Sequence, residues 1–241
     1  MDLNQKTEAL INTGESEGLR SFFGKVYNYM AGGLAVSGIA AYLSTKEPLF
    51  SLFYKAGSDG YMTFTLLGWV AVLAPLVMIF MMYSAAARMH ASRAAAIFWV
   101  FSALMGVSLS NIFLLYSGNS IFQAFLVTAG AFFGMSIYGY TTKKSLASWG
   151  SFLFMGLIGV ILAMIVNIFL KSSMLGFAVS IIAVFVFVGL TAYDTQRLKM
   201  IYNENDMQGA KDSKAIMGAV ALYLDFINLF RLILYFIGDR R

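Results

Sequence analysis

The chain has 241 residues, of which 59% are hydrophobic and only 12% are charged, with a net charge of +5. A soluble domain carries about 25% charged residues, so this composition excludes a water-soluble globule and indicates a membrane protein. The absence of Cys and the single histidine, His90, exclude disulfides, iron–sulfur clusters, Cys/His zinc sites and thiol catalysis within one chain. No cofactor is predicted, and the scattered Lys and Arg argue against nucleic acid as a partner.

Residues 1–21 are polar and of mixed charge, and they lack the basic start and short apolar run of a secretory signal. We therefore predict a polar cytoplasmic tail over 1–21. The length of the remaining chain suits one compact bundle rather than several domains. Residues 22–241 are predicted to form a single transmembrane domain.

Seven apolar segments follow the tail, each close to the 20 or so residues that a spanning helix needs. They cover 22–44, 62–84, 94–116, 120–141, 151–170, 174–196 and 215–237. The weakest division is Lys171-Ser172-Ser173, where a helical hairpin fits better than one uninterrupted helix. Because the apolar runs are long and show no alternation, strands are not expected. The predicted fold class is an all-α, seven-helix membrane bundle.

Two further local features concern helix packing. Gly32-Gly33 in the first span and Gly130 with Gly134 in the fourth indicate close helix contacts, or for the second pair a dimer interface. Pro75 is expected to kink the second span, because its ring and missing N–H disrupt the local hydrogen bonds.

The orientation follows from the positive-inside rule. With the N-terminus inside, the cytoplasmic segments hold eleven Lys and Arg and the opposite side holds five, leaving out Arg231 within the last span. The N-terminus is therefore predicted to be cytoplasmic and the C-terminus to lie outside. Lys143 and Lys144 are interpreted as part of this topology signal.

Few ionisable side chains fall within the predicted spans, where a charge costs several kcal/mol and suggests function. Asp225 lies well inside the last span, Asp194 lies near the cytoplasmic end of the sixth, and Arg88 lies at the cytoplasmic end of the second. The predicted topology brings these three to the inner half of one bundle. Asp194 matches the depth of Asp225 if the sixth helix continues through Arg197 and Lys199.

Two buried carboxyl groups in contact disfavour double ionisation, so Asp194 and Asp225 are expected to share a proton and to titrate together. Arg88 nearby would hold the helices together as a latch. The carboxylates are also hard oxygen ligands, which suit Ca²⁺, so the pair is a candidate pH sensor, gate and Ca²⁺ site.

A purely structural interpretation stays open beside this one. Asp194 and Arg197 are spaced i,i+3 and could form an interfacial salt bridge. Asp225 and Asn228 share a helix face and could make a satisfied polar contact between helices.

The two aspartate segments resemble a known family. Tyr193-Asp194 followed by Gln196, and Leu222–Phe230 in the last span, are similar to the hallmark of the Bax-inhibitor-type family, also called the transmembrane Bax inhibitor motif family. Gly106–Leu109 is similar to a third family segment, and that register places Arg88 on the gating arginine. The bacterial branch of this family includes YccA and YetJ.

The resemblance implies a multi-pass protein of the bacterial cytoplasmic membrane, with six helices around a central seventh. It also implies a pH-sensitive calcium leak in which the aspartate pair is latch and sensor. Here the loop between the aspartates is longer, with Asn203–Asp206 and Gly209 inserted, and the second span has no acidic residue. Because YccA is a partner of the membrane protease FtsH, the alternative function is a modulator of a protease of that type, engaged through the polar tail.

An enzyme is not predicted. The segment before Asp225 is Leu222–Leu224 rather than the Gly-x-Gly of intramembrane aspartyl proteases. The one Gly-x-Ser-x-Gly match, Gly14–Gly18, lies in the polar tail with no strand before it and so lacks the context of a serine nucleophile.

Overall fold

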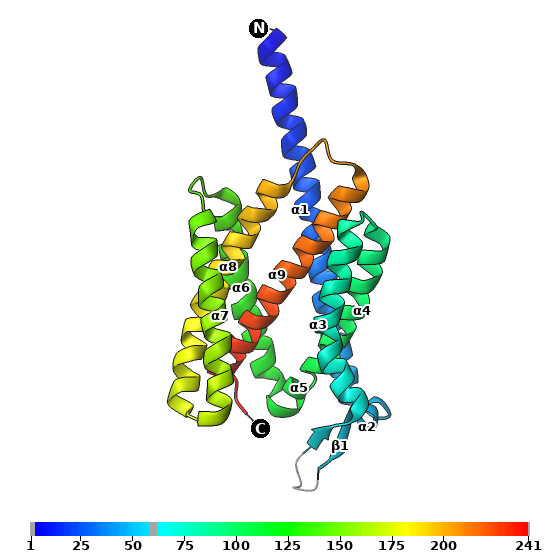
Figure 1. Ribbon diagram of the computed structural model, residues 1–241, viewed down its shortest axis with the longest axis vertical. Coiled ribbons are helices and arrows are strands. Elements are labelled where there is room, and N and C mark those ends of the chain that lie inside the picture. Colours follow the sequence, from blue (N-terminus) through cyan, green and yellow to red (C-terminus); the bar gives the residue numbers. More distant parts are fainter. Residues whose placement is uncertain (1–2, 58–61, 241) are drawn as a thin grey trace. The chain divides into compact units, whose positions relative to one another are not determined.

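A computed structural model describes residues 3–57 and 62–240, with side chains described from residue 17 onwards (Figure 1). Nearly all of the described chain is helical. The helices are α1 (Leu3–Leu43), α2 (Leu49–Phe53), α3 (Leu66–Ala87), α4 (Ala91–Leu109), α5 (Asn111–Leu115), α6 (Gly118–Thr141), α7 (Ala147–Leu170), α8 (Ser173–Ile201) and α9 (Gln208–Ile237). Two short strands, β1 (Tyr54–Ala56) and β2 (Met62–Phe64), precede α3.

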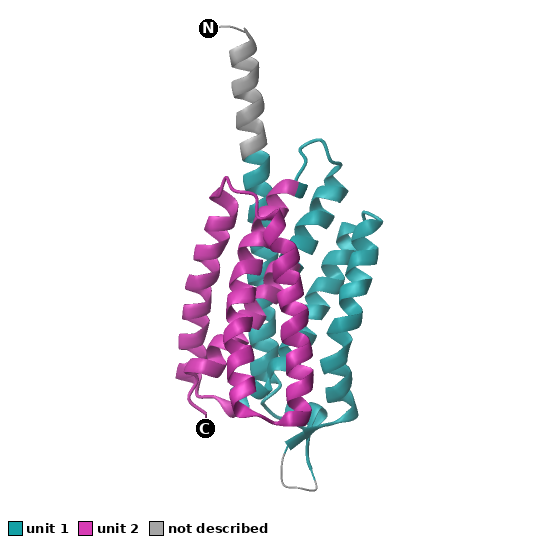
Figure 2. Cartoon of the chain, turned by 60° about the vertical axis from the view of Figure 1, so that its left-hand side comes forward, with its two compact units in different colours: residues 1–114, 201–220 teal, residues 115–200, 221–241 magenta. Residues whose placement is uncertain are grey.

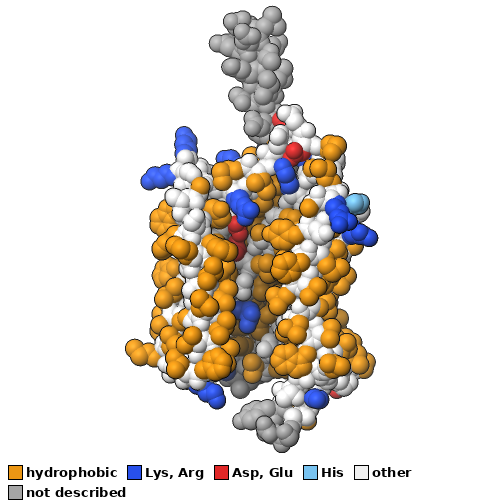
Figure 3. Space-filling view, in the orientation of Figure 1, with side chains coloured by type: hydrophobic (Ala, Val, Ile, Leu, Met, Phe, Trp, Pro, Cys, Tyr) orange, Lys and Arg blue, Asp and Glu red, His pale blue; other side chains and the backbone are white. Residues whose placement is uncertain are grey.

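Six segments of the described chain are long and apolar enough to cross a membrane: α3, α4 continued through α5, α6, α7, α8 and α9. They correspond to the second through seventh predicted spans. Large apolar side chains such as Leu66, Phe80 and Phe169 are more than three-quarters exposed. Figure 3 shows such side chains covering the helices, while Lys and Arg gather mostly near the helix ends. The protein is therefore an all-α membrane protein in its spanning part.

The first predicted span, 22–44, falls on the second part of α1, which begins much earlier, at Leu3. The predicted tail, 1–21, is continuous with this helix over its described backbone. α1 is not among the six candidate spans, because several Gly, Ser, Tyr and Asn residues dilute its apolar character. The number of spans, seven, stays a prediction.

The chain divides into two compact units, drawn in different colours in Figure 2. Unit 1 comprises residues 1–114 and 201–220, and unit 2 comprises residues 115–200 and 221–241. α9 thus contributes its first part to unit 1 and the rest, with Asp225, to unit 2.

Unit 1 is built on the packing of α4 against α1 and α3. The glycines of α1 were correctly predicted as contact points, since a Cβ at Gly33 would collide with the ring of Phe98 on α4. The Ser37 hydroxyl donates to the Ser102 carbonyl oxygen across the same contact at 2.7 Å. α3 continues through Pro75, which is buried inside it.

The β1–β2 hairpin was not expected, because the prediction considered only the long apolar runs. The strands pair antiparallel with Tyr54 opposite Phe64, and the two rings are 5.1 Å apart. Aromatic residues favour strands, and the sequence between them is rich in Gly, Ser and Asp. The hydroxyl groups of Tyr54 and Ser110 are hydrogen-bonded at 2.7 Å, and burial raises the pKa of Tyr54.

Unit 2 contains α6, α7, α8 and the second part of α9. The predicted hairpin is confirmed: α7 ends at Leu170, Lys171 adopts a left-handed conformation with φ of 50°, and α8 begins at Ser173. An apolar core joins α7, α8 and α9 through residues such as Leu153, Ala183 and Leu229. The rings of Phe132 on α6 and Phe226 on α9 are in contact at 5.6 Å.

The glycines of α6 behave differently from the prediction. A Cβ at Gly130 or Gly134 would meet no atom of the described chain within 4 Å, so neither is a packing point within it. The close contact lies five residues after Gly134, at Gly139, where a Cβ would collide with the backbone of Ala192 on α8.

This difference gives a matched pair of variants. Gly139→Ala is expected to lower the free energy of unfolding by about 1–3 kcal/mol, because the added methyl group forces α6 away from α8. Gly130→Ala is expected to leave it unchanged or to raise it by up to about 1 kcal/mol, since Ala is the better helix former. Thermal unfolding in detergent measures both, and equal melting temperatures would contradict the α6–α8 contact.

Candidate functional site

The two predicted aspartates lie on adjacent transmembrane helices of unit 2. Asp194 is half-buried on α8, which continues to Ile201 as the prediction required. Asp225 is buried on α9, with 5% of its surface exposed. Their carboxyl groups lie within hydrogen-bonding reach of one another. The structure thus brings the predicted pair together.

One carboxylate oxygen of Asp225 has no hydrogen-bond donor among the described residues. Its Oδ2 atom is buried and receives no hydrogen bond from the described residues. A buried polar atom without a partner costs about 1–3 kcal/mol, and such atoms are rare in native proteins. This oxygen is therefore suited to bind a proton, a water molecule or a cation reversibly.

The supporting residues take more local roles. The Arg197 side chain is exposed and acts on Asp194 through its charge. It forms no direct ion pair with Asp194 in the described part of the chain. Asn228 donates to the Leu224 carbonyl oxygen of its own helix at 2.9 Å, so its predicted role in a polar contact between helices is not the one seen. The Tyr193 ring packs where a Cβ at Gly150 of α7 would lie.

Two further arginines, Arg88 and Arg231, lie on α3 and α9. Arg88 caps the C-terminal end of α3 in unit 1, and its side chain is exposed. Its pairing with Asp194 or Asp225 stays a prediction. Arg231 lies on the part of α9 that belongs to unit 2, after Asp225, and other residues of the protein leave its side chain uncovered.

Gln196 is a residue whose role the sequence did not disclose. Its side chain is buried, and its Oε1 accepts a hydrogen bond from the Leu146 N–H at 2.7 Å. Its Nε2 donates to the Lys144 carbonyl oxygen at 2.9 Å. These two hydrogen bonds hold the connection between α6 and α7 against α8, at a position two residues after Asp194. The available signal was its place in the same segment as Tyr193 and Asp194, near the end of α8.

The C-terminal part of α8 also makes polar contacts with α6. The hydroxyl groups of Thr195 and Ser136 are hydrogen-bonded at 3.0 Å, and both residues are buried. Lys199 lies over the Tyr140 ring and donates to the Tyr140 carbonyl oxygen at 3.0 Å. Asp194 is therefore carried by a helix whose end is fixed to its neighbours.

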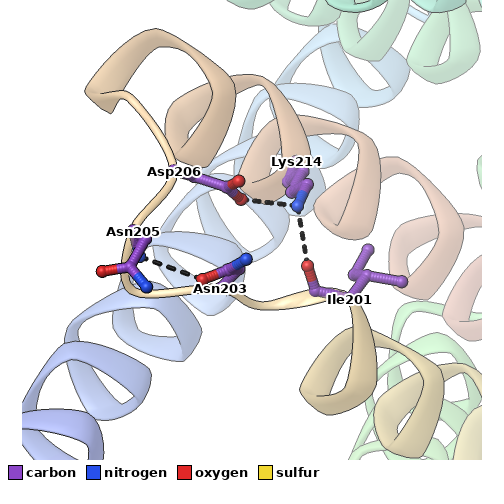
Figure 4. A network of polar contacts seen from close by, with 5 residues as sticks. All are labelled: Ile201, Asn203, Asn205, Asp206 and Lys214. Carbon is purple, nitrogen blue, oxygen red and sulfur yellow. Dashed lines mark hydrogen bonds and ion pairs between the residues drawn. The ribbon is translucent and has the colours of Figure 1, made fainter.

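The loop between the aspartates is held by Lys214 (Figure 4). In unit 1, the Lys214 Nζ donates to the Ile201 carbonyl oxygen at 2.8 Å and to Asp206 at 2.5 Å. The Asn203 side chain accepts from the Asn205 N–H at 3.0 Å. The last carbonyl group of α8 is thus tied to the first turns of α9.

A resident metal site is not evident in the described residues, which contain no group of three or more His, Cys, Asp or Glu side chains suited to hold an ion. Asp194 and Asp225 offer four carboxylate oxygens between them, whereas Ca²⁺ takes about 6–8 oxygen ligands. A Ca²⁺ ion at this pair would have to keep water or take backbone oxygens.

Comparison with known proteins places the chain among related sequences. A family model described as "Inhibitor of apoptosis-promoting Bax1" matches residues 19–241. An uncharacterized protein of Rickettsia prowazekii is 43% identical over 242 residues, which cover 98% of each chain. An uncharacterized protein of Caulobacter vibrioides is 45% identical over 93% of this chain and 90% of its own length. The inner membrane protein YbhL of Escherichia coli K12 is 40% identical over 93% of this chain and 94% of YbhL.

Proposed function

Because the chain belongs to the family of inhibitors of apoptosis-promoting Bax1, we propose that it is a pH-sensitive calcium leak of a bacterial inner membrane, gated by Asp194 and Asp225. The inner membrane is the location of the similar protein YbhL. The proposal extends to seven spans around a central last helix, with the N-terminus in the cytoplasm, and it includes no catalytic activity.

The contact between the two carboxyl groups carries this proposal. A hydrogen bond between two carboxyl groups needs one proton, so the contact between α8 and α9 depends on the protonation of the pair. Removing that proton leaves two negative charges side by side, and adding a second proton removes the charge that strengthens the hydrogen bond. Each change weakens the contact, which makes the pair a sensor of pH.

The buried carboxylate oxygen of Asp225 that has no hydrogen-bond donor supports the calcium part of the proposal. Oδ2 is the buried oxygen that receives no hydrogen bond from the described chain, and a carboxylate oxygen is the ligand that Ca²⁺ prefers. A cation at the pair competes with the shared proton. Calcium and protons therefore act on the same two carboxyl groups, and Arg88 is proposed as the latch that one of them binds when the leak is closed.

Calcium entry into vesicles tests whether the leak exists. The purified protein is reconstituted into liposomes that hold a calcium-sensitive dye, and entry is followed after calcium is added outside at a series of pH values. We expect entry above that of protein-free liposomes, with a rate that changes with pH. Entry equal to that of protein-free liposomes at every pH would overturn the leak and favour the alternative below.

The alternative is a modulator of a membrane-bound protease of the FtsH type without transport activity. The polar segment 1–21 favours it, since a polar segment that precedes the first span offers a handle in the cytoplasm.

Deletion of residues 2–20 separates the two functions. A leak through the transmembrane helices should keep its calcium entry, because the deleted residues precede the predicted spans. Engagement by a protease through this segment should be lost, measured as co-purification with the protease and as its rate of substrate degradation. If the deletion abolishes calcium entry but leaves co-purification with the protease unchanged, the transmembrane helices are not sufficient for the leak and the segment is not the site that the protease engages.

A further inference from the structure

A cavity of about 600 Å³ in unit 1 lies outside the site described above. It is formed by α1, the start of α4 and the first turns of α9. The polar and aromatic residues that line it are Lys25, Asn28, Tyr29, Ser92, Trp99 and Asp212. Its volume is within the range of about 300–1,000 Å³ that ligand sites have.

The charges in the lining are one cation and one anion. Lys25 Nζ and Asp212 Oδ1 are 2.7 Å apart, and Gln208 Nε2 donates to the same oxygen at 2.9 Å. The side chains of Lys25 and Asp212 remain 44% and 32% exposed, so a ligand in the cavity can reach both. The Asp212 Oδ2 atom takes part in neither of these two bonds.

Two aromatic side chains also line the cavity. The rings of Tyr29 and Trp99 are 5.8 Å apart, and Trp99 is 39% exposed. Gly32 makes room for the indole, because a Cβ there would lie 2.7 Å from it. Faces of Trp and Tyr attract an ammonium group, and these residues are enriched where a membrane meets water.

The depth of the cavity suits a lipid headgroup. The span formed by α4 begins at Ala91, and Ser92 of the lining is its second residue. The cavity therefore opens at the end of a membrane span, at the level where headgroups lie. A ligand with only a negative charge would lie beside Asp212, and a ligand with only a positive charge would lie beside Lys25. A zwitterion matches both.

We propose that this cavity binds the headgroup of a zwitterionic phospholipid with a primary ammonium group, that is, a phosphoethanolamine headgroup. Lys25 and Asn28 bind the phosphate, and Asp212 accepts hydrogen bonds from the ammonium. Trp99 and Tyr29 cover the ammonium and the adjoining glycerol. A choline headgroup carries the same charges but has no N–H donor for Asp212, so it binds more weakly.

Native mass spectrometry of the full chain tests this proposal. The protein is released from nanodiscs with equal amounts of phosphatidylethanolamine, phosphatidylcholine and phosphatidylglycerol of distinct acyl masses. We expect phosphatidylethanolamine to be retained about tenfold more than either other lipid, as the loss of a charge-assisted hydrogen bond implies. Equal retention of the three lipids would overturn the proposal without any variant.

Substitutions then locate the site. Asp212→Asn should remove the preference for ethanolamine over choline, and Lys25→Met should reduce retention of both lipids. Asp206→Asn is the matched control, since Asp206 belongs to the other described ion pair of unit 1 and does not line the cavity. An unchanged lipid preference in Asp212→Asn, or the same loss in Asp206→Asn, would overturn the assignment. Binding of free phosphoethanolamine together with no retained lipid of any class would overturn the lipid assignment and identify a soluble ligand instead.

Discussion

Calcium entry through an Asp225→Asn variant is expected to lose most of its dependence on pH. The Asn amide has no proton to release in this range, yet it donates a hydrogen bond to Asp194 at every pH. The contact between α8 and α9 then no longer depends on a shared proton. The entry rates at acid and alkaline pH should agree within about twofold, because the amide resembles the protonated partner at both. Proteoliposomes with an internal calcium dye give the rates.

The matched control is Asp239→Asn, which removes a carboxyl group from an exposed position of the same unit. It should keep the pH profile of the wild-type protein. A wild-type profile in Asp225→Asn, or a flat profile in Asp239→Asn, would show that the buried pair does not set the response.

Replacement of Gln196 by Met is expected to lower the free energy of unfolding without altering the pH response. Met has a similar size but offers neither of the hydrogen bonds that hold the Leu146 N–H and the Lys144 carbonyl group. Leu146 is buried, so its N–H is left without an acceptor at a cost of about 1–3 kcal/mol. Thermal unfolding in detergent measures this loss.

Gln123→Met is the control for this variant, because Gln123 is exposed on α6 and its replacement should leave the melting temperature unchanged. If Gln196→Met melts at the wild-type temperature, the α6–α7 connection does not depend on Gln196. If instead it flattens the pH profile as Asp225→Asn does, Gln196 belongs to the gate rather than to its support.

The membrane helices were predictable because a bilayer imposes a length and an apolar composition that are visible in the sequence. All seven predicted spans fall on helices, six of which are long and apolar enough to cross a membrane, and the hairpin at Lys171 was located correctly. The β1–β2 hairpin was missed because each strand has only three residues, which is too short to show an alternating pattern in the sequence. Gly130 and Gly134 are not packing points within the described chain, because spacing alone does not show whether a neighbouring helix faces them, and the dimer interface stays a prediction.

The aspartate pair was predictable for a similar reason, since a carboxyl group in an apolar span is costly and needs a partner. The residue counts placed Asp194 and Asp225 on two consecutive helices, which the structure confirms, while their depth in the membrane stays a prediction. The role of Gln196 was not predictable, because its hydrogen-bond partners are backbone groups of the α6–α7 connection, about 50 residues earlier in the chain. The cavity beside Lys25 and Asp212 depends on contacts between residues 187 positions apart, which a single sequence does not specify.

A double variant, Asp194→Asn with Asp225→Asn, tests the paired action of the two carboxyl groups most directly. Calcium entry is measured against pH for the wild type, both single variants and the double variant in parallel liposome preparations. If the two groups work as one unit, either single substitution flattens the profile and the double variant adds nothing further. Effects of the single variants that add up in the double variant would show that the carboxyl groups titrate independently, which contradicts the proposed gate.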